Sequence, residues 1–479
     1  MDAGSIPQGV LMVIERLNAH GHPAFVVGGA VRDLLLQRSP KDWDVATAAR
    51  PEEVLRLFPG ARPTGLRYGT VTALDPELGG VEVTTFRTDG PYLDGRHPAA
   101  VTFAEGLEGD LARRDFTINA LAYHPETGII DHHGGLADLA HRRLDTVGDP
   151  ASRFGEDALR MLRACRFAAE LGFRPVKRVL AACRERAPLL GAVSSERQRD
   201  ELTKLLVAPQ ARRGLQLLRV GGLLPVLLPE LGDTYGLRQS HHHAYTVFSH
   251  TVRAVSLIAP VLPLRLVALF HDLGKVATRT EDASGAPLFP GHHRVSAEIA
   301  GRALRRLRFP GEVVERVVRL VERHMFHWTP AEGEAGLRRL LAEVGPDDLL
   351  ALVALRRADL LAMRPLQPGD RRLTVLENLE TAVSRVLAAA PPVRPTDLAV
   401  SGEDLMREFA LPPGPAIGRL LKLLLAAVLD EPALNRRESL LDLARLSLGR
   451  VVADEAAGEV RGVVQSQKDG SAFPPSRHR

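Results

Sequence analysis

The stretch VVGGAVRDLLLQRSPKDWDVAT, Val26 to Thr47, sets two glycines and an arginine ahead of two aspartates. A strand-like apolar segment runs into Gly28-Gly29, and AVRDLLLQ has the composition of a helix. Small residues at such a turn let backbone N–H groups approach a phosphate, and Arg32 would add a charge-assisted contact. An ordinary strand–turn–helix would also use glycine, for the turn alone. The stretch therefore predicts an α/β unit and raises the hypothesis of a phosphate site.

The two aspartates, Asp42 and Asp44, flank Trp43. On a strand, side chains two residues apart point to the same face, so we expect both carboxylates together and Trp43 packed on the far face. Two hard oxygen ligands on one rigid face suit Mg²⁺ when substrate phosphates supply the remaining ligands. Because D-x-D alone is common on polar surfaces, the metal site is a hypothesis that the neighbouring glycines strengthen.

Composition places the chain among soluble globular proteins. It has 479 residues, of which 45% are hydrophobic and 25% charged, and a net charge of +4. Two cysteines, Cys165 and Cys183, are too few for a disulfide framework or a cysteine-built zinc site. We find no signal-peptide core and no apolar run of about 20 residues, so we expect a cytoplasmic protein without a membrane partner.

The character of the chain changes near residue 155. Strand-like FVVGGAV and VEVTTF and the short helix PEEVLRLFP precede that point, whereas GEDALRMLRACRFAAELGF reads as one helix that ends at Gly172. Residues 151–220 hold 15 Lys and Arg against 7 Asp and Glu. Such a block indicates a surface for a polyanion, or a solvated arginine-rich face.

Further motifs follow the opening stretch in a recognisable order: VEVTTFRTDGPYLDGRHPAAVTF, DLARRDFTINALAY, GEDALRMLRACRF and SERQRDEL. Together the five segments resemble the class II nucleotidyltransferases, which are the bacterial CCA-adding enzymes and poly(A) polymerases of the polymerase β-like superfamily. The resemblance covers about residues 20–235. It implies a tRNA 3′ end as acceptor and CTP and ATP as substrates.

The resemblance also assigns roles to individual residues. It implies that Asp42 and Asp44 are catalytic and hold Mg²⁺, and that Gly29 and Arg32 contact the triphosphate. Within RRDFTINA, Arg114 would face the nucleotide and Asp115 the ribose. Asn119 in the same motif would contribute there or serve as a structural hydrogen-bonding residue.

Asp157 and Arg160 are the residues that the resemblance assigns to base selection. Three residues apart on a helix, they would lie near one face. A carboxylate accepts from an exocyclic amine and a guanidinium donates to ring acceptors, which favours C and A over G and U. Arg163 and Arg166 follow at three-residue steps and are assigned to the nucleotide, although Arg166 would also suit a tRNA phosphate and the row would also suit a solvated stripe.

The implied reaction is attack of the tRNA 3′-hydroxyl on the α-phosphate of CTP or ATP, with release of pyrophosphate. RYGTVTALDPELGGVEVTTFR lacks the basic element of bacterial poly(A) polymerases, which favours CCA addition. The loop RTDGPYLDGRHP favours the complete activity over a CC-only enzyme. A partial CC- or A-adding enzyme and a poly(A) polymerase remain the alternatives.

A second set of motifs is rich in histidine: HHHAYTVFSHTVRAV, LVALFHDLGKVAT, GHHRVSAEIA and LVERHMFH. They resemble the HD phosphohydrolase superfamily, which implies a divalent transition metal or Mg²⁺ and phosphatase or 2′,3′-cyclic phosphodiesterase activity. The implied ligands are His250, His271, Asp272 and Asp359, with His292 and His324 as additional positions. His241–His243 would line the pocket or cap a helix, and Lys275 would meet substrate phosphate or be an exposed helix-terminal lysine.

The two resemblances together predict an α+β protein. We expect a polymerase β-like nucleotidyltransferase head with a mixed five-stranded sheet, then an all-α neck and body, an α-helical HD domain and a helical tail. The expected boundaries are 1–150 for the head, 151–237 for the neck and body, 238–389 for the HD domain, 390–450 for the tail and 451–479 for a disordered end. Two alternatives remain. One is a phosphohydrolase whose head has become an RNA-binding module, and the other is a non-enzymatic RNA chaperone or RNA-binding protein with both sites silent.

Overall fold

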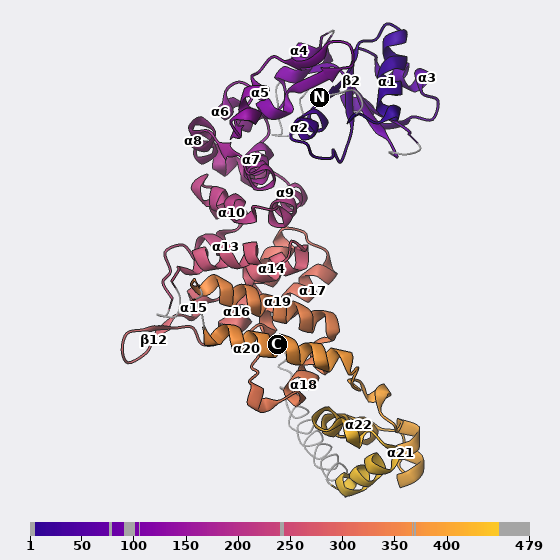
Figure 1. Ribbon diagram of the computed structural model, residues 1–479, viewed down its shortest axis with the longest axis vertical. Helices are drawn as coiled ribbons and strands as arrows, with labels where there is room; N and C mark the ends of the chain where they lie inside the picture. Colours follow the sequence, from indigo (N-terminus) through magenta and orange to yellow (C-terminus); the bar gives the residue numbers. More distant parts are fainter. Residues whose placement is uncertain are drawn as a thin grey trace, which may run out of the picture. The chain divides into compact units, whose positions relative to one another are not determined.

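The computed structural model describes residues 5–75, 79–90, 101–104, 106–239, 244–365, 367 and 370–449 (Figure 1). Expectations about the loop at 91–98, about His241–His243 and about 451–479 fall outside the described residues. The chain forms two compact units. The first is Met1–Glu322 with Leu361–Arg364, and the second is Arg323–Leu360 with Pro365–Arg479.

The head is built on a mixed sheet of seven strands in the order β3-β4-β5-β2-β1-β8-β9, so the expected number of five was wrong. β2 pairs with β5 in parallel, whereas its other neighbour, β1, is antiparallel to it. The strands are β1 (Ala24–Val27), β2 (Asp44–Thr47), β3 (Arg62–Gly65), β4 (Thr70–Ala73), β5 (Val81–Thr85), β8 (Leu121–His124) and β9 (Gly128–Asp131).

Buried apolar residues join the sheet to its helices. Val27, Ala46, Phe86 and Leu111 belong to one cluster, and each is at most 1% exposed. Fully burying such side chains contributes about 1.5–3 kcal/mol for each large residue. The head also contains α1 (Gln8–Ala19), α2 (Gly29–Leu35), α3 (Pro51–Leu57), α4 (Leu107–Ala112), α5 (Gly135–Ala140) and the small pair β6 (Arg87–Asp89) and β7 (Val101–Phe103).

The segment expected to be one helix from residue 155 is two helices. α6 (Pro150–Glu156) is opened by Asp149, whose side chain accepts from the backbone N–H of Ser152, and α7 (Leu159–Leu171) follows. Between them Asp157 adopts an extended backbone, with φ −144° and ψ 105°. The interpretation that Asp157 and Arg160 share one helical face was therefore wrong. As expected, α7 ends at Gly172, which takes the left-handed conformation that glycine tolerates best.

Helices continue through the rest of the first unit. α7 packs against α9 and α10, and α14 packs against α9, α13 and α16. These helices are α8 (Lys177–Arg186), α9 (Ser195–Val207), α10 (Ala211–Val220), α11 (Leu224–Leu227), α12 (Pro229–Gly232), α13 (Val247–Leu257), α14 (Leu262–Phe270), α15 (Lys275–Thr278), α16 (His292–Arg306) and α17 (Gly311–Arg323). A hairpin of β12 (Thr280–Glu281) and β13 (Pro287–Leu288) lies between α15 and α16, and β10 (Arg143–Leu144) pairs with β11 (Arg174–Pro175).

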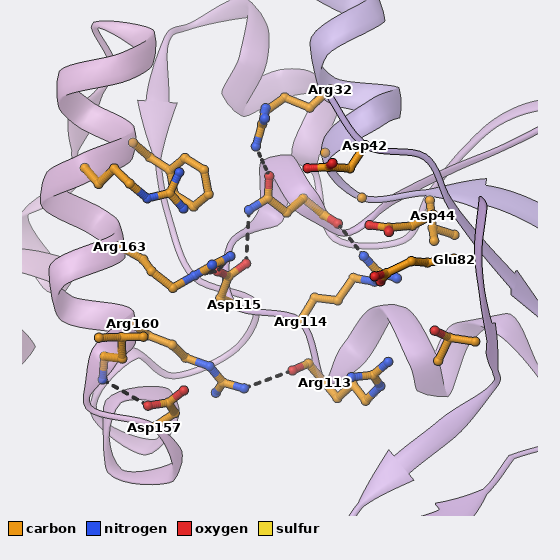
Figure 2. Close-up of a pocket in the computed structure, with 18 of the residues that line it drawn as sticks. Arg32, Asp42, Asp44, Glu82, Arg113, Arg114, Asp115, Asp157, Arg160 and Arg163 are labelled. Atoms are coloured by element: carbon orange, nitrogen blue, oxygen red, sulfur yellow. Dashed lines mark hydrogen bonds and ion pairs between the residues drawn. The ribbon is translucent and has the colours of Figure 1, made fainter. Parts of the chain in front are cut away.

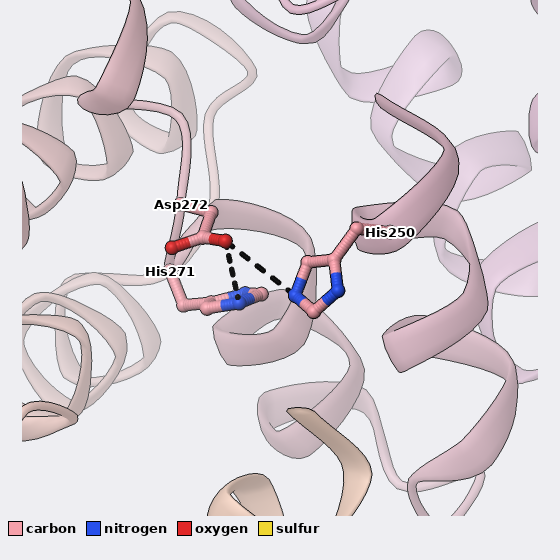
Figure 3. Close-up of side chains that lie close together, drawn as sticks. All are labelled: His250, His271 and Asp272. Atoms are coloured by element: carbon pink, nitrogen blue, oxygen red, sulfur yellow. Dashed lines mark ion pairs between the residues drawn. The ribbon is translucent and has the colours of Figure 1, made fainter. Parts of the chain in front are cut away.

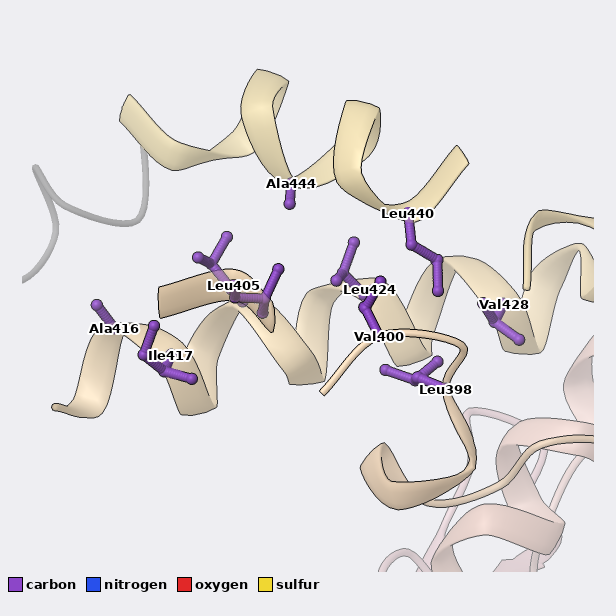
Figure 4. Packing of buried hydrophobic residues seen from close by; sticks show 10 residues of the cluster. Leu398, Val400, Leu405, Ala416, Ile417, Leu424, Val428, Leu440 and Ala444 are labelled. Carbon is purple, nitrogen blue, oxygen red and sulfur yellow. The ribbon is translucent and has the colours of Figure 1, made fainter. Parts of the chain in front are cut away.

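The second unit is helical in its described part and has its own apolar core. Leu405, Leu420 and Leu424 are fully buried against Leu440 of the helix at 437–449 (Figure 4). The helices before it are α18 (Ala335–Val344), α19 (Pro346–Met363), α20 (Arg371–Ala388), α21 (Gly402–Phe409) and α22 (Pro415–Asp430).

Among the described residues, no helix has both the length and the apolar composition that crossing a bilayer requires.

Candidate functional site

A pocket of about 580 Å³ opens where the head sheet meets α7 and α9. All ten residues assigned to nucleotide binding and catalysis line it: Gly29, Arg32, Asp42, Asp44, Arg114, Asp115, Asp157, Arg160, Arg163 and Arg166. Figure 2 shows the carboxylates of Asp42 and Asp44 on one side and the side chains from α7 on the other. The sequence motifs, which span more than a hundred residues, therefore form one site.

The carboxylate side of the pocket lies on β2 and β5. Asp44 is the first residue of β2 and Asp42 precedes it, yet both face the pocket, while Trp43 between them is buried. Glu82 lies directly beside Asp44 in the parallel register and lines the same pocket. Burial raises the pKa of Asp44, and the charges of Asp42 and Asp110 add to the rise, whereas Arg114 opposes it.

The same crowding affects Glu82. Burial raises its pKa first, and the charges of Asp44 and Asp42 raise it further. Three hard oxygen donors whose negative charges oppose one another fit a divalent cation, which would relieve the repulsion that the pKa shifts report.

The turn at Gly28 explains why glycine is needed before α2. Gly28 has φ 76° and ψ −131°, a conformation that side chains rarely adopt, and a Cβ there would lie 2.6 Å from Nη1 of Arg114. Arg114 in turn forms a 3.1 Å ion pair with the fully buried Asp110. The glycine therefore lets a cation held by Asp110 approach the turn closely.

A hydrogen-bonded chain runs from α2 to α7. Arg32 Nη1 donates to Asn119 Oδ1 at 2.6 Å, Asn119 Nδ2 donates to Asp115 Oδ1 at 3.1 Å, and Arg163 Nε donates to Asp115 Oδ2 at 2.7 Å. Burial alone would raise the pKa of Asp115, but the Arg163 charge and the hydrogen bonds from Asn119 and Arg163 hold it well below its usual value. Asp115 is thus an ionised, fixed acceptor.

The two residues assigned to base selection each have a protein partner. Asp157 forms a 2.6 Å ion pair with Arg197 of α9 and accepts a hydrogen bond from the Leu159 backbone N–H. Arg160 pairs with Glu156 and donates to the Arg113 carbonyl at 3.3 Å. These contacts fix the direction in which each side chain presents its donor or acceptor.

Arg166 is buried, whereas an arginine of a solvated stripe would be exposed. It is 8% exposed and forms ion pairs with Glu201 at 2.5 Å and Glu170 at 2.8 Å.

A second cluster lies at the end of α14. Asp272 Oδ2 is 3.3 Å from Nε2 of His271 and 3.5 Å from Nε2 of His250 on α13 (Figure 3), and Asp272 Oδ1 is 3.4 Å from Nε2 of His292 on α16. All four residues are buried.

The histidine tautomers fit a metal. Nδ1 of His271 lies 2.8 Å from the Ala268 carbonyl, and Nδ1 of His292 lies 2.9 Å from the Phe289 carbonyl. A carbonyl only accepts, so each Nδ1 carries the proton and each Nε2 directs its lone pair toward Asp272. Nitrogen lone pairs and a carboxylate converging in this way form a donor set for a divalent cation.

Lys275 is buried, so its interpretation as an exposed helix-terminal lysine was wrong. It is 7% exposed and donates at 2.7 Å to both Asp272 Oδ2 and Gln239 Oε1. Burial would raise the pKa of Asp272, but the charge of Lys275 beside it holds that pKa well below its usual value.

Two further expected ligands, His324 and Asp359, belong to the second compact unit. Their part in the cluster stays a prediction.

Comparisons with known proteins identify the family of the chain. The family models that match are the Poly A polymerase head domain at residues 24–145, the RNA and SrmB-binding site of polymerase A at 172–234, the HD domain at 247–364 and the tRNA nucleotidyltransferase domain 2 at 371–444. The CCA-adding enzyme of Geobacillus kaustophilus is 34% identical over 89% of this chain and 94% of its own length. The chain belongs to the CCA-adding enzyme family.

Other members of this family give the same result. The CCA-adding enzyme of Streptococcus gordonii is 35% identical over 90% of this chain and 96% of its own length. The crystal structure of the Bacillus stearothermophilus CCA-adding enzyme in complex with CTP matches with a TM-score of 0.69 and 30% identity, over 95% of this chain and 98% of the other. The resemblance to class II nucleotidyltransferases and the predicted α+β fold class are confirmed.

Several residues of the site could not be assigned from the sequence of this CCA-adding enzyme family member. Glu82 could have been found, because it is the one charged residue in the strand VEVTTF. It lies beside the metal motif of Asp42 and Asp44 in the pocket, although it is distant from that motif in the sequence. Arg197 lies within the motif SERQRDEL, but the sequence gives no signal that its partner is Asp157, 40 residues earlier. The sequence alone allows two roles for Asn119, and the structure places its side chain between those of Arg32 and Asp115.

Proposed function

We propose that this chain adds the 3′-terminal CCA to tRNA from CTP and ATP without a nucleic-acid template. The observation that carries the proposal is the single pocket in which three carboxylates face a row of guanidiniums and the Asp157–Arg160 pair. An acidic cluster suits a catalytic cation, a basic wall suits a triphosphate, and a carboxylate–guanidinium pair suits the pairing edge of a base.

The residues divide the reaction among them. Asp42 and Asp44, with Glu82 beside them, would hold Mg²⁺, which when bound supplies charge stabilisation for phosphoryl transfer. Arg32 and Arg114 bind the triphosphate near Gly29, and Asp115 accepts from the ribose. The tRNA 3′-hydroxyl oxygen bonds to the α-phosphorus and its proton passes to solvent. The bond between the α-phosphorus and the α–β bridging oxygen breaks, and pyrophosphate leaves with the electron pair of that bond.

Base choice rests on Asp157 and Arg160, with Arg163 and Arg166 completing the basic wall. Cytosine and adenine both carry an exocyclic amine that donates to a carboxylate and ring nitrogens that accept from a guanidinium. Guanine and uracil present a carbonyl at the corresponding position, which would face Asp157 without a hydrogen bond.

We further propose that the HD cluster hydrolyses phosphate esters at damaged tRNA 3′ ends, including 2′,3′-cyclic phosphates. His250, His271, Asp272 and His292 would hold a divalent transition metal or Mg²⁺, with His324 and Asp359 as predicted additions. When bound, the metal would activate water or polarise the phosphate. Lys275, already beside Asp272, offers a cation to the substrate phosphate.

The domain boundaries expected from the sequence are part of this proposal, with nucleotide selection at 151–237 and tRNA contacts on the basic block. We place the activity in the cytoplasm because tRNA, CTP and ATP occur there together.

The test uses pure protein, Mg²⁺ and tRNA that ends before its CCA, with labelled CTP or ATP alone and together. We expect C from CTP alone and C, C and A from the mixture. No incorporation in any mixture would refute the proposal, C alone or A alone would assign a partial enzyme, and long A tails would assign a poly(A) polymerase. Asp44→Asn is the matched control that should incorporate nothing.

A further inference from the structure

One aromatic ring lies at the centre of the basic wall. Phe167 on α7 is 3% exposed and meets Phe116 edge-on, with ring centroids 5.6 Å apart. The guanidinium carbons of Arg166, Arg163 and Arg32 lie 4.0, 5.2 and 5.2 Å from the Phe167 centroid. Two of these arginines come from α7 and the third comes from α2 of the head.

These three cations would repel one another without compensation. Each has a carboxylate partner on another side: Asp33 for Arg32, Asp115 for Arg163, and Glu170 and Glu201 for Arg166. A carboxylate stabilises a guanidinium but also cancels its charge, so it competes with the phosphates of an incoming nucleotide. An aromatic face attracts a cation through its quadrupole and carries no formal charge.

We propose that Phe167 is a positioning residue that gathers Arg32, Arg163 and Arg166 into one binding surface for the anionic nucleotide without adding a further negative charge to that surface. Phe167 lines the pocket together with the three arginines, and the role proposed for it acts through them. It also links α2 to α7, so that the triphosphate and base sides of the pocket share one anchor. This inference rests on the proposed nucleotidyltransferase function.

The test weakens the quadrupole of the Phe167 ring in steps while keeping the size of the ring nearly constant. Phe167 is replaced with 4-fluoro-, 3,5-difluoro- and 3,4,5-trifluorophenylalanine in the full chain. The readouts are the Kd for CTP by calorimetry, KM and kcat for C addition, and the melting temperature. The same series at Phe154, a fully buried ring of α6 for which no guanidinium contact is found in the described part of the chain, is the matched control.

We expect Kd and KM to rise with each step of fluorination at Phe167, to roughly tenfold at the trifluoro variant, because fluorine withdraws the charge that attracts the cations. The kcat should change much less, and Phe167→Leu should resemble the trifluoro variant. The Phe154 series should leave Kd and KM unchanged.

Two results would overturn the inference. One is a flat Kd across the Phe167 series. The other is a Kd that rises by the same amount in the Phe167 and Phe154 series and only where the melting temperature falls. That result would indicate that Phe167 has a structural role alone. If the affinity for CTP fell with fluorination at Phe167 as expected, but the unsubstituted protein added no C or A to tRNA, the proposed function would fail while this inference stood.

Discussion

Replacing Arg197 with glutamine tests whether base selection depends on a partner outside the selecting motif. Arg197 lies on α9, and its Nη2 donates to Asp157 Oδ2 at 2.6 Å. The other oxygen of Asp157 accepts from the Leu159 backbone, at the start of α7. Without Arg197 the carboxylate keeps one contact and gains freedom to rotate.

The size of the effect follows from the geometry. The side chains of Arg197 and Asp157 are 21% and 15% exposed, so the ion pair is shielded from water but not fully buried. Hydrogen bonds to charged groups contribute about 1.5–3 kcal/mol, which corresponds to a roughly 10- to 100-fold loss in kcat/KM for C and A. Guanine and uracil donate no hydrogen bond to this carboxylate, so kcat/KM for GTP and UTP should fall less than kcat/KM for CTP and ATP. The preference for C and A over G and U should therefore become smaller.

The assay measures kcat/KM for each of the four nucleoside triphosphates on tRNA that ends before its CCA. Arg199→Gln is the matched control, because Arg199 lies on the same helix but donates to the Arg308 carbonyl and to Asp200 instead. A variant at position 197 that keeps wild-type discrimination would refute the reasoning, as would an equal effect of Arg199→Gln.

Three further predictions follow from the two sites. Gly28→Ala should lower the free energy of unfolding by about 1–3 kcal/mol and raise KM for CTP, because the new Cβ meets Arg114 at a positive φ; urea unfolding and initial rates measure both, and unchanged values would contradict the strain argument. Asp44→Asn should raise the melting temperature in EDTA near pH 7. Because the folded-state pKa of Asp44 is raised, its charge lowers the stability of the fold above that pKa. The advantage of the variant should therefore disappear as the pH falls toward 3.8, the ordinary pKa of an aspartate, and a variant no more stable than wild type at pH 7 would be inconsistent with this reasoning. His271→Ala should abolish hydrolysis of 2′,3′-cyclic phosphate and lower divalent-metal content measured by plasma emission, while CCA addition continues; loss of addition as well would show that the two sites are not independent.

Much of the nucleotide site could be predicted because its motifs are local. Gly28, Arg32, Asp42 and Asp44 lie within one short stretch, and the chemistry of each residue type limits what it can do there. The resemblance then joined that stretch to Asp115 and Arg160, and the structure places them in one pocket.

The features that were missed depend on contacts between distant parts of the chain. Glu82 meets Asp44 only through strand register, and Arg197 meets Asp157 only because α9 packs against α7. The break at Asp157 was hidden because residues 156–160, EDALR, contain neither proline nor glycine to mark the end of a helix, whereas in the structure the Asp157 side chain accepts a hydrogen bond from the Leu159 backbone N–H. Phe167 looked like an ordinary core residue, and only the positions of three arginines give it a role.

The most direct test of the central claim, that the protein alone selects the bases, is the sequence of the product. tRNA that ends before its CCA is incubated with the protein, Mg²⁺ and all four nucleoside triphosphates together, and the 3′ ends are sequenced. We predict that the extended molecules end in CCA and stop there. Ends that contain G or U in proportion to the supplied nucleotides, or long tails of A, would contradict selection by Asp157 and Arg160.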